Sequence, residues 1–336
     1  RRSSDLLITR YDYDGRDCIE TNFVDGSSGQ MEVVPDVQKI QYKVNGNWVD
    51  VPSGGLGPIC KGTSITFKAI PTNGSWTTGY PIWGGDASGT GVEKTVTFNN
   101  SGSRTITARS NNTVSATINV GETNSNINLQ WLAPVITETP VAGDSVTQAT
   151  HPVVEYHACA NIQNNTWNLR VSSISAGSEI TIRTGGYRDP DLQPPTNQTE
   201  ARDAVNELNE YYENGRGSWH KTSASEAHER HHDSEIKCAT QHYWAATETA
   251  LESLSLAFND YNSESSAINQ FKTMTNGANT KIVNFESIVD EYQNTLSDDP
   301  PSRPYAAGQI ILNGAITRIG DLATQNGWSV RGILHP

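Results

Sequence analysis

The sequence predicts a multidomain protein with an all-β amino-terminal half and a mostly α-helical carboxyl-terminal half. Two patterns predict this division. Up to about residue 197, short runs of alternating apolar and polar residues are separated by clusters of Gly, Asn and Ser, which is typical of antiparallel β-sheets. Beyond residue 197, apolar residues recur at spacings of three or four, the period of an α-helix.

The first half contains a hairpin signature and several further strand patterns. Residues 39–44 alternate between polar and apolar, and Asn45-Gly46 then provides a tight turn into residues 48 and 49. Further alternating runs lie at 64–69, 95–98, 105–108, 114–118, 153–156, 167–171 and 179–183. We therefore expect an antiparallel sandwich within residues 1–133 and a β-rich connecting domain at 134–197, which ends in a Pro-rich segment.

Part of the first domain is similar to the PKD and Ig-like modules of secreted and surface proteins. The similarity rests on three segments, at residues 61–67 (Lys-Gly-Thr-Ser-Ile-Thr-Phe), 83–86 (Trp-Gly-Gly-Asp) and 102–108 (Gly-Ser-Arg-Thr-Ile-Thr-Ala). This resemblance implies a β-sandwich that serves as a spacer or an adhesive unit rather than as a catalyst.

Four helices are predicted in a third domain, at residues 198–336. Their expected ranges are 199–213, 224–258, 265–296 with an interruption at Asn276-Gly277, and 306–325. The second is the longest because it contains no Gly and no Pro. Residues 223–226 (Ser-Ala-Ser-Glu) at its start have the form of a capping box, which favours a helix beginning there.

Residues 228–232 read His-Glu-Arg-His-His and fall within this long helix. On a helix, His228 and His232 lie one turn apart on one face, a spacing that lets both imidazoles bind a single Zn²⁺. Glu229 lies beside them, where its carboxylate can act as a general base toward water. The segment therefore predicts a zinc site with a catalytic glutamate.

This pentapeptide and its helix resemble the HExxH motif of the zincin metallopeptidases. The resemblance implies that His228 and His232 bind zinc and that Glu229 is the catalytic base in hydrolysis of a polypeptide substrate. Metzincins continue with Gly and His three and six residues after the second His, but Glu235 and Cys238 occupy those positions here. The resemblance is thus closer to the gluzincins, whose third ligand is a downstream Glu.

The third ligand stays open at this point. Glu248 and Glu252 lie downstream on the same predicted helix, and Glu252 has the separation found in thermolysin-like gluzincins. A straight helix would, however, place Glu252 about 30 Å from His232. Either the helix breaks after about residue 241, or the ligand comes from the next helix, which offers Glu286, Asp290 and Glu291.

Other polar residues near the motif receive lesser roles. We expect Glu235 to contact His232 rather than the metal, and His231 to lie on the surface. His220 precedes the helix, where a mobile loop would bring it over the metal to stabilise an oxyanion. His242 is expected to be structural. Residues 229–232 also match the Glu-x-x-His element of di-iron bundles, but the sequence contains no second copy, so zinc is favoured.

Composition narrows the class of protein. Among 336 residues, 24 basic and 37 acidic side chains give a formal charge of −13, which argues against nucleic acid or an anionic membrane surface as partner. No apolar run approaches the roughly 20 residues needed to span a bilayer. The abundance of Asn, Ser, Thr and Gly favours an extracellular or cell-surface protein. No signal peptide opens the chain, so we expect an upstream segment to be removed or to lie outside it.

Four cysteines, Cys18, Cys60, Cys159 and Cys238, permit three pairings if all are oxidised. The pairs Cys18–Cys60 and Cys159–Cys238 require the least chain crossing, and an extracellular location favours disulfides. The alternative is buried free thiols.

Two functions of different kinds follow from these features. The first is a secreted or cell-surface zinc-dependent metallopeptidase. The second is a non-enzymatic structural, adhesive or filament protein that binds a surface protein partner and carries a structural or vestigial metal site. Three protein ligands with one open position would favour the enzyme, and four protein ligands would favour the structural role. No feature of the sequence indicates an oligomeric state.

Overall fold

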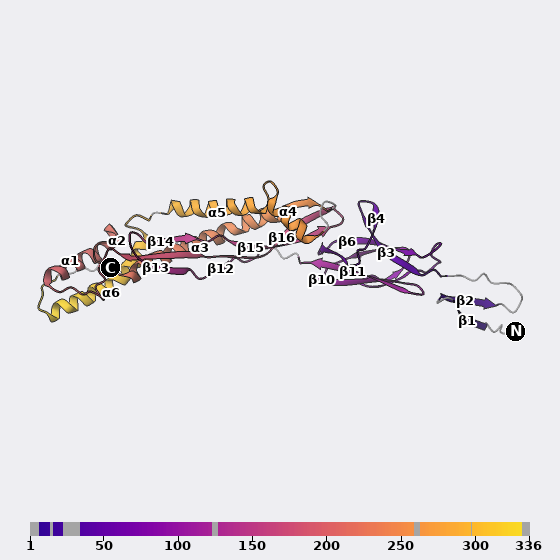
Figure 1. Cartoon of the computed structure of the whole chain (residues 1–336), viewed down its shortest axis with the longest axis horizontal. Coiled ribbons are helices and arrows are strands. Elements are labelled where there is room, and N and C mark those ends of the chain that lie inside the picture. Colours follow the sequence, from indigo (N-terminus) through magenta and orange to yellow (C-terminus); the bar gives the residue numbers. More distant parts are fainter. Residues whose placement is uncertain are drawn as a thin grey trace. The chain divides into compact units, whose positions relative to one another are not determined.

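The computed structural model describes residues 7–13, 16–22, 34–122, 127–258, 263–296 and 298–330. The chain divides into two compact units, which we call unit 1 and unit 2. Unit 1 comprises Arg1–Ser125, Tyr156–Val171 and Leu251–Ala278, and unit 2 comprises Asn126–Glu155, Ser172–Ala250 and Asn279–Pro336. The predicted order of β-sheets followed by helices is confirmed (Figure 1), but the predicted boundaries at 133 and 197 coincide with neither unit.

The apolar core of unit 1 lies in two β-sheets, apart from the two-stranded sheet of β1 and β2. One sheet is antiparallel throughout, in the order β4-β3-β6-β9 (Asn47–Asp50, Val37–Val44, Ser64–Pro71, Glu93–Thr97). The other contains β5-β11-β10-β7-β8 (Leu56–Cys60, Thr113–Gly121, Gly102–Arg109, Ile82–Gly85, Gly89–Thr90). β3 contacts β10 and β11, and apolar side chains of both sheets, among them Ile40, Phe67, Trp83, Ile106 and Ile118, are buried.

The predicted hairpin between β3 and β4 is confirmed. Asn45 and Gly46 have φ values of 49° and 77°, as the two central residues of a type I′ turn require. The second sheet departs from the prediction because β5 pairs with β11 in parallel. Gly57 permits this pairing: a Cβ at this position would lie 2.3 Å from the backbone oxygen of Asn119.

A disulfide joins Cys60 at the end of β5 to Cys159 in β15 (Val153–Asn161). Both predicted pairs that involve these cysteines are therefore wrong. β15 lies beside β5 in parallel, with Ala160 opposite Ile59, so the sheet brings together residues that are 99 apart in the chain. Cys238 is a free, exposed thiol rather than a buried one. Cys18 belongs to β2 (Arg16–Asn22), which pairs with β1 (Leu7–Tyr13), but its side chain lies outside the described residues.

The remaining elements of unit 1 come from later in the chain. The part of β16 (Thr166–Ala176) that belongs to unit 1 pairs with β18 (Ser255–Ala257), and α4 (Glu264–Thr273) follows. The long helix was expected to reach residue 258, but it ends at Glu252 because the chain there turns into β18.

Unit 2 combines a three-stranded sheet with helices. The sheet has the order β13-β17-β14 (Val135–Ala142, Ser178–Gly185, Val146–Ala149), so β14 is an edge strand. β13 pairs with β17 in parallel, and the short β12 (Gln130–Trp131) pairs with β16 in parallel. The helices are α1 (Gln198–Asn209), α2 (Tyr211–Asn214), most of α3 (Thr222–Glu252), α5 (Ala278–Thr295) and α6 (Arg303–Gln325).

The helices lie close to their predicted positions. The expected interruption at Asn276-Gly277 separates α4 from α5, and Asn276 has a φ of 55°. α1 begins after Asn197, whose side chain accepts a hydrogen bond from the Glu200 backbone N–H. Within the described part of the chain, no helix is both long and apolar enough to cross a lipid bilayer.

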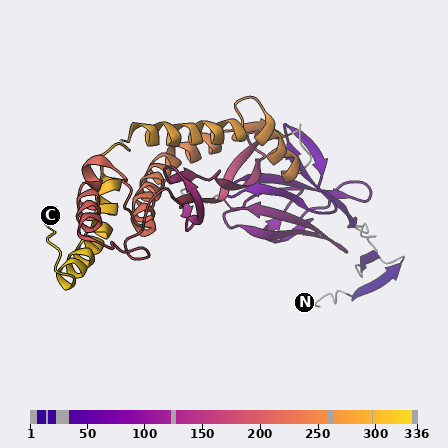
Figure 2. The same cartoon turned by 60° about the vertical axis from the view of Figure 1, so that its left-hand side comes forward.

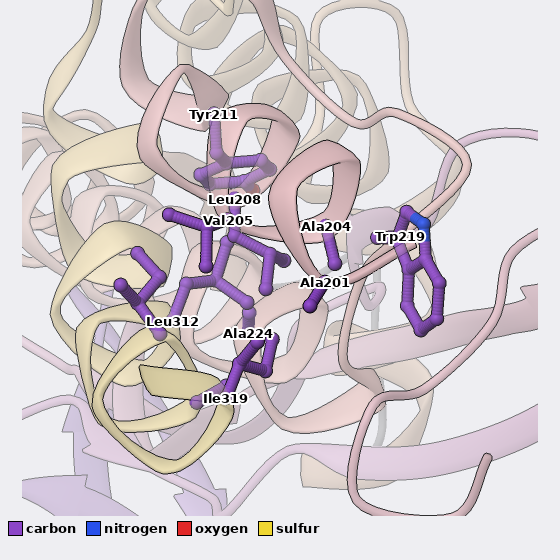
Figure 3. Packing of buried hydrophobic residues seen from close by; sticks show 11 residues of the cluster. Ala201, Ala204, Val205, Leu208, Tyr211, Trp219, Ala224, Leu312 and Ile319 are labelled. Atoms are coloured by element: carbon purple, nitrogen blue, oxygen red, sulfur yellow. The ribbon is translucent and has the colours of Figure 1, made fainter. Parts of the chain in front are cut away.

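A hydrophobic cluster holds the start of α3 against α1 and α6 (Figure 3). Its members include Leu208 of α1, Ala224 of α3 and Leu312 of α6, each with no exposed surface. Gly308 lets α6 approach closely, because a Cβ there would lie 2.7 Å from Cε1 of Tyr211. The cluster thereby fixes Tyr211 and the first turn of α3, from which the motif residues extend.

Candidate metal centre

The motif residues project from the first third of α3 and meet a loop from later in the chain. The helix is unbroken from Thr222 to Glu252, so His228 and His232 lie one turn apart on the same face, as predicted. Facing them is Asp298, which lies between the end of α5 at Thr295 and the start of α6 at Arg303. These three residues are the group in the described part of the chain whose donor atoms all lie within 4.8 Å of one another.

The three donor atoms form a nearly equilateral triangle. The Asp298 Oδ1 atom is 3.0 Å from Nε2 of His228 and 3.0 Å from Nε2 of His232. The two Nε2 atoms are 3.2 Å apart. Ligand atoms that surround a tetrahedral Zn²⁺ at its usual bond lengths are separated by about 3.3 Å. The triangle therefore has the size that a zinc ion requires.

The contact between His232 and Glu235 bears on which ring nitrogen is available to the triangle. The Nδ1 atom of His232 lies 3.1 Å from Oε2 of Glu235, a carboxylate that can only accept a hydrogen bond. When His232 is neutral and donates from Nδ1 to Glu235, the lone pair of its Nε2 faces the triangle and is available to a cation. The predicted contact between Glu235 and His232 is confirmed. The Nδ1 atom of His228 lies 3.4 Å from the hydroxyl of Tyr211.

Glu229 lies beside the triangle and is held by the edge strand β14. The residue is 4 % exposed, and its Oε1 is 4.0 Å from Nε2 of His228. The hydroxyl of Thr147 donates to Glu229, at 2.8 Å from Oε2 and 3.0 Å from the backbone oxygen. Burial raises the pKa of Glu229, although the Thr147 hydrogen bond and the charges of His228 and His232 oppose this shift. A carboxylate with a raised pKa is suited to accept a proton and release it again.

The contacts within the triangle shift the pKa values of Asp298 and His232 in opposite directions. Hydrogen bonds from His228 and His232 hold the pKa of Asp298 well below its usual range, so its carboxylate stays ionised. Burial lowers the pKa of His232, but the hydrogen bond to Asp298 and the charges of Asp298, Glu229 and Glu235 raise it by more, and the net shift is upward. Two imidazoles thus face an ionised carboxylate, an arrangement that could hold either a shared proton or a metal ion.

A polar cavity of about 200 Å³ opens beside the triangle on the side of Glu229. The ring of Tyr305 lies 4.6 Å from that of His228, and the ring of Tyr211 lies 5.1 Å from that of Tyr305. Burial raises the pKa of Tyr305 to about 12 and also raises that of Tyr211, so both phenols are neutral hydrogen-bond donors. The other residues that line the cavity are Asp144, Ser145, Arg216, His220, Ser225, His228, Glu229, Asp298 and Asp299.

The structure does not bring the expected glutamates to the histidines. Because α3 continues without a break, Glu252 lies about 30 Å along the helix from His232. Glu248 is buried elsewhere and accepts a hydrogen bond from the backbone N–H of Ile127, at 2.8 Å. Neither is the third ligand of this group, and the carboxylate at the histidines is an aspartate. Glu286 and Asp290 of α5 line a different cavity, and Glu291 is exposed.

The other histidines also have clear positions. His220 precedes α3, lines the cavity beside the triangle and is 1 % exposed, with its ring 5.1 Å from Tyr211 and 5.2 Å from Tyr187. Burial lowers the pKa of His220 to about 3, so it is neutral. His231 lies outside the triangle and reaches Glu235 at 3.3 Å. His242 is exposed against Tyr243.

Asp298 is the site residue that the sequence did not reveal. The predicted third ligands were acidic residues of the same helix and of the next one, and the loop that follows the next helix was not among them. One signal was present: the acidic pair Asp298-Asp299 occupies the break between two predicted helices, directly before two prolines. The loop after α5 reaches the first third of α3, and the sequence does not specify which of its carboxylates lies at the histidines.

In comparisons with protein-family models, curated proteins and solved structures, nothing matches this chain.

Proposed function

We propose that this protein is a zinc-dependent peptidase whose metal is held by His228, His232 and Asp298. The observation that carries the proposal is the triangle of donor atoms, 3.0 to 3.2 Å apart, with the buried carboxylate of Glu229 beside it. Two imidazoles and one carboxylate are a donor set that zinc favours. Three protein ligands leave one position open, which is the pattern of catalytic rather than structural zinc sites.

The residues around the triangle would divide the chemistry among themselves. Zinc held by His228, His232 and Asp298 would supply Lewis acidity toward a substrate carbonyl and toward water. Glu229 would accept the proton of the attacking water and pass it to the leaving amine, since its raised pKa suits both steps. Thr147 would hold the Glu229 carboxylate in place through its hydroxyl. Glu235 would keep His232 in the tautomer that binds metal.

The edge strand β14 supports a polypeptide as substrate. Strand β14 pairs with β17 on one side only, and Thr147 from its middle contacts Glu229. Val146, Gln148 and Ala149 are exposed. An unpaired strand edge can bind an extended peptide through backbone hydrogen bonds. A substrate bound in this way would run past the metal, with a peptide bond near Glu229.

An extracellular or cell-surface location fits the same proposal. The Cys60–Cys159 bond persists in oxidising surroundings, and such bonds are rare in reducing compartments. The formal charge of −13 and the abundance of Asn, Ser and Thr agree with this location.

The test is proteolysis of an unfolded protein substrate such as reduced casein by the purified chain. We expect cleavage that a chelator abolishes and that added Zn²⁺ restores. Glu229→Gln removes the general base but no metal ligand, so it should retain zinc and lose cleavage by about a thousandfold. The matched control is Glu226→Gln, one turn earlier on α3, where the glutamate pairs with Arg230 away from the triangle.

Two results would contradict the peptidase. One is a zinc-loaded wild-type chain that cleaves no protein or peptide substrate. The other is a Glu229→Gln variant that cleaves as fast as the Glu226→Gln control, since any activity would then arise elsewhere.

A further inference from the structure

A second cavity of about 110 Å³ lies in unit 2, and three of the elements that line it, α3, β14 and α5, also extend to the triangle or to Glu229 beside it. α3 contributes His232 to the triangle and Thr240 to the cavity. The edge strand β14 contributes Thr147 near Glu229 and Ala149 to the cavity. α5 contributes Asp290 to the cavity and leads to Asp298 at the triangle. Figure 1 and Figure 2 both show α5 running alongside α3.

The distances from the triangle and Glu229 to the cavity match the length of a short extended peptide. His232 and Thr240 are about 12 Å apart along the helix axis, and Thr147 and Ala149 are about 7 Å apart along the strand. An extended peptide covers such distances in about two to four residues. A peptide on the edge of β14 with its reacting bond at Glu229 would therefore place a nearby side chain at the cavity.

A hydrogen bond connects the lining of the cavity to the segment of α3 that carries His232. Trp131, which lines it, donates from Nε1 to Oδ1 of Asp233 at 3.2 Å, and Asp233 directly follows His232. Ser178 donates to the same oxygen at 2.6 Å, opposite Ala149 in the sheet. These two hydrogen bonds fix the position of the Trp131 indole, which lines the cavity, relative to the triangle.

The lining has an apolar floor and an acidic rim. Apolar surface comes from Trp131, Ala149, Pro152, Ala176, Phe285 and Val289. Glu286 and Asp290 stand one turn apart on α5 at the rim, and the described lining contains no lysine or arginine. His151 contacts Glu286 at 2.5 Å, but its own side chain is 94 % exposed and can be displaced.

We propose that this cavity is the subsite that selects a substrate with lysine or arginine two to four residues from the cleaved bond. The methylene stem of such a side chain would cover the apolar floor, and its cationic head would reach Glu286 and Asp290. The proposal rests on the peptidase function proposed above, because that function places the peptide on β14.

The test maps cleavage of a randomised peptide library by the full chain loaded with zinc. Wild type should favour Lys and Arg over norleucine at one position within four residues of the cleaved bond. Glu286→Gln/Asp290→Asn should lower that preference about tenfold. Glu291→Gln, the neighbouring carboxylate that does not line the cavity, should leave it unchanged. Glu286→Lys/Asp290→Lys should shift the preference toward acidic side chains, a gain that a misfolded protein would not show.

A binding measurement separates failure of the subsite from failure of the function. Fluorescent alanine–serine peptides that carry a single arginine or a single norleucine are titrated against zinc-loaded Glu229→Gln protein. Arginine-dependent binding that requires Glu286 and Asp290, without cleavage by wild type, would overturn the peptidase and keep the subsite. Cleavage by wild type with no basic preference would overturn the subsite and keep the peptidase. Equal binding of both peptides without cleavage would overturn both.

Discussion

The two units of the molecule bury different kinds of side chain. Among the described residues, the buried polar side chain of unit 1 is Thr63, and its core is otherwise apolar. Unit 2 buries ionisable groups as well, including His220, His228, Glu229 and Glu248. Burying a charge is costly unless it is paired or binds a metal. Unit 1 therefore has an almost purely apolar core, whereas unit 2 also buries ionisable groups, of which His228 belongs to the triangle and Glu229 lies beside it.

The units also differ in what can link their distant segments. In unit 1, the Cys60–Cys159 disulfide connects strands 99 residues apart in sequence. In unit 2, Cys238 is a free thiol, and α3 meets the loop before α6 through His228, His232 and Asp298. A metal ion in the triangle would act as the cross-link of unit 2. Zinc should accordingly stabilise unit 2, and reduction of the disulfide should weaken unit 1.

The largest effect is expected from Asp298→Ala, which would break the cross-link of unit 2. Loss of the only carboxylate ligand should weaken zinc binding by about a thousandfold, because two imidazoles remain and the ion loses its anionic partner. The dissociation constant is measured by competition with a fluorescent zinc chelator. Asp299→Ala, the adjacent acid outside the triangle, should stay within about threefold of wild type. Equal affinities for the two variants would remove Asp298 from the ligand set.

Next in size is the effect of removing the cross-link of unit 1. Cys60→Ala/Cys159→Ala should lower the free energy of unfolding of unit 1 by about 2–5 kcal/mol, because the bond closes a long loop. Chemical denaturation followed by Trp fluorescence measures the loss, with Cys238→Ala as the control that should change little. Zinc affinity should be unchanged in both variants. A drop in zinc affinity comparable to the loss of stability would show that the two units are not independent.

The smallest effect concerns the residue that orients His232. Glu235→Gln keeps the size of the side chain but replaces a carboxylate acceptor by an amide that can present either its oxygen or its nitrogen to Nδ1. We expect a loss of zinc affinity of about tenfold without a change in the folding of unit 1. Isothermal titration calorimetry with Zn²⁺ provides the measurement. An unchanged affinity would show that the contact between Glu235 and His232 has no part in metal binding.

Local features of this chain could be predicted, and long-range ones could not. The absence of Gly and Pro predicted α3, and Asn45-Gly46 predicted the β3–β4 hairpin, because both depend on neighbouring residues. The geometry of His228, Glu229 and His232 follows from helical spacing alone. The Cys60–Cys159 pair and Asp298 depend instead on which strands and loops meet in space. The sequence places Asp298 in a break between two predicted helices but does not specify its approach to α3, and the pairing of β5 with β15 determines the disulfide.

The most direct test of the zinc centre is the metal content of the full chain after equilibrium dialysis against Zn²⁺. It is measured by mass spectrometry beside His228→Ala/His232→Ala. We expect about one zinc per wild-type chain and none above background in the double variant, with both proteins folded by circular dichroism. A wild-type chain without zinc, or equal zinc in both proteins, would contradict a metal centre at His228, His232 and Asp298.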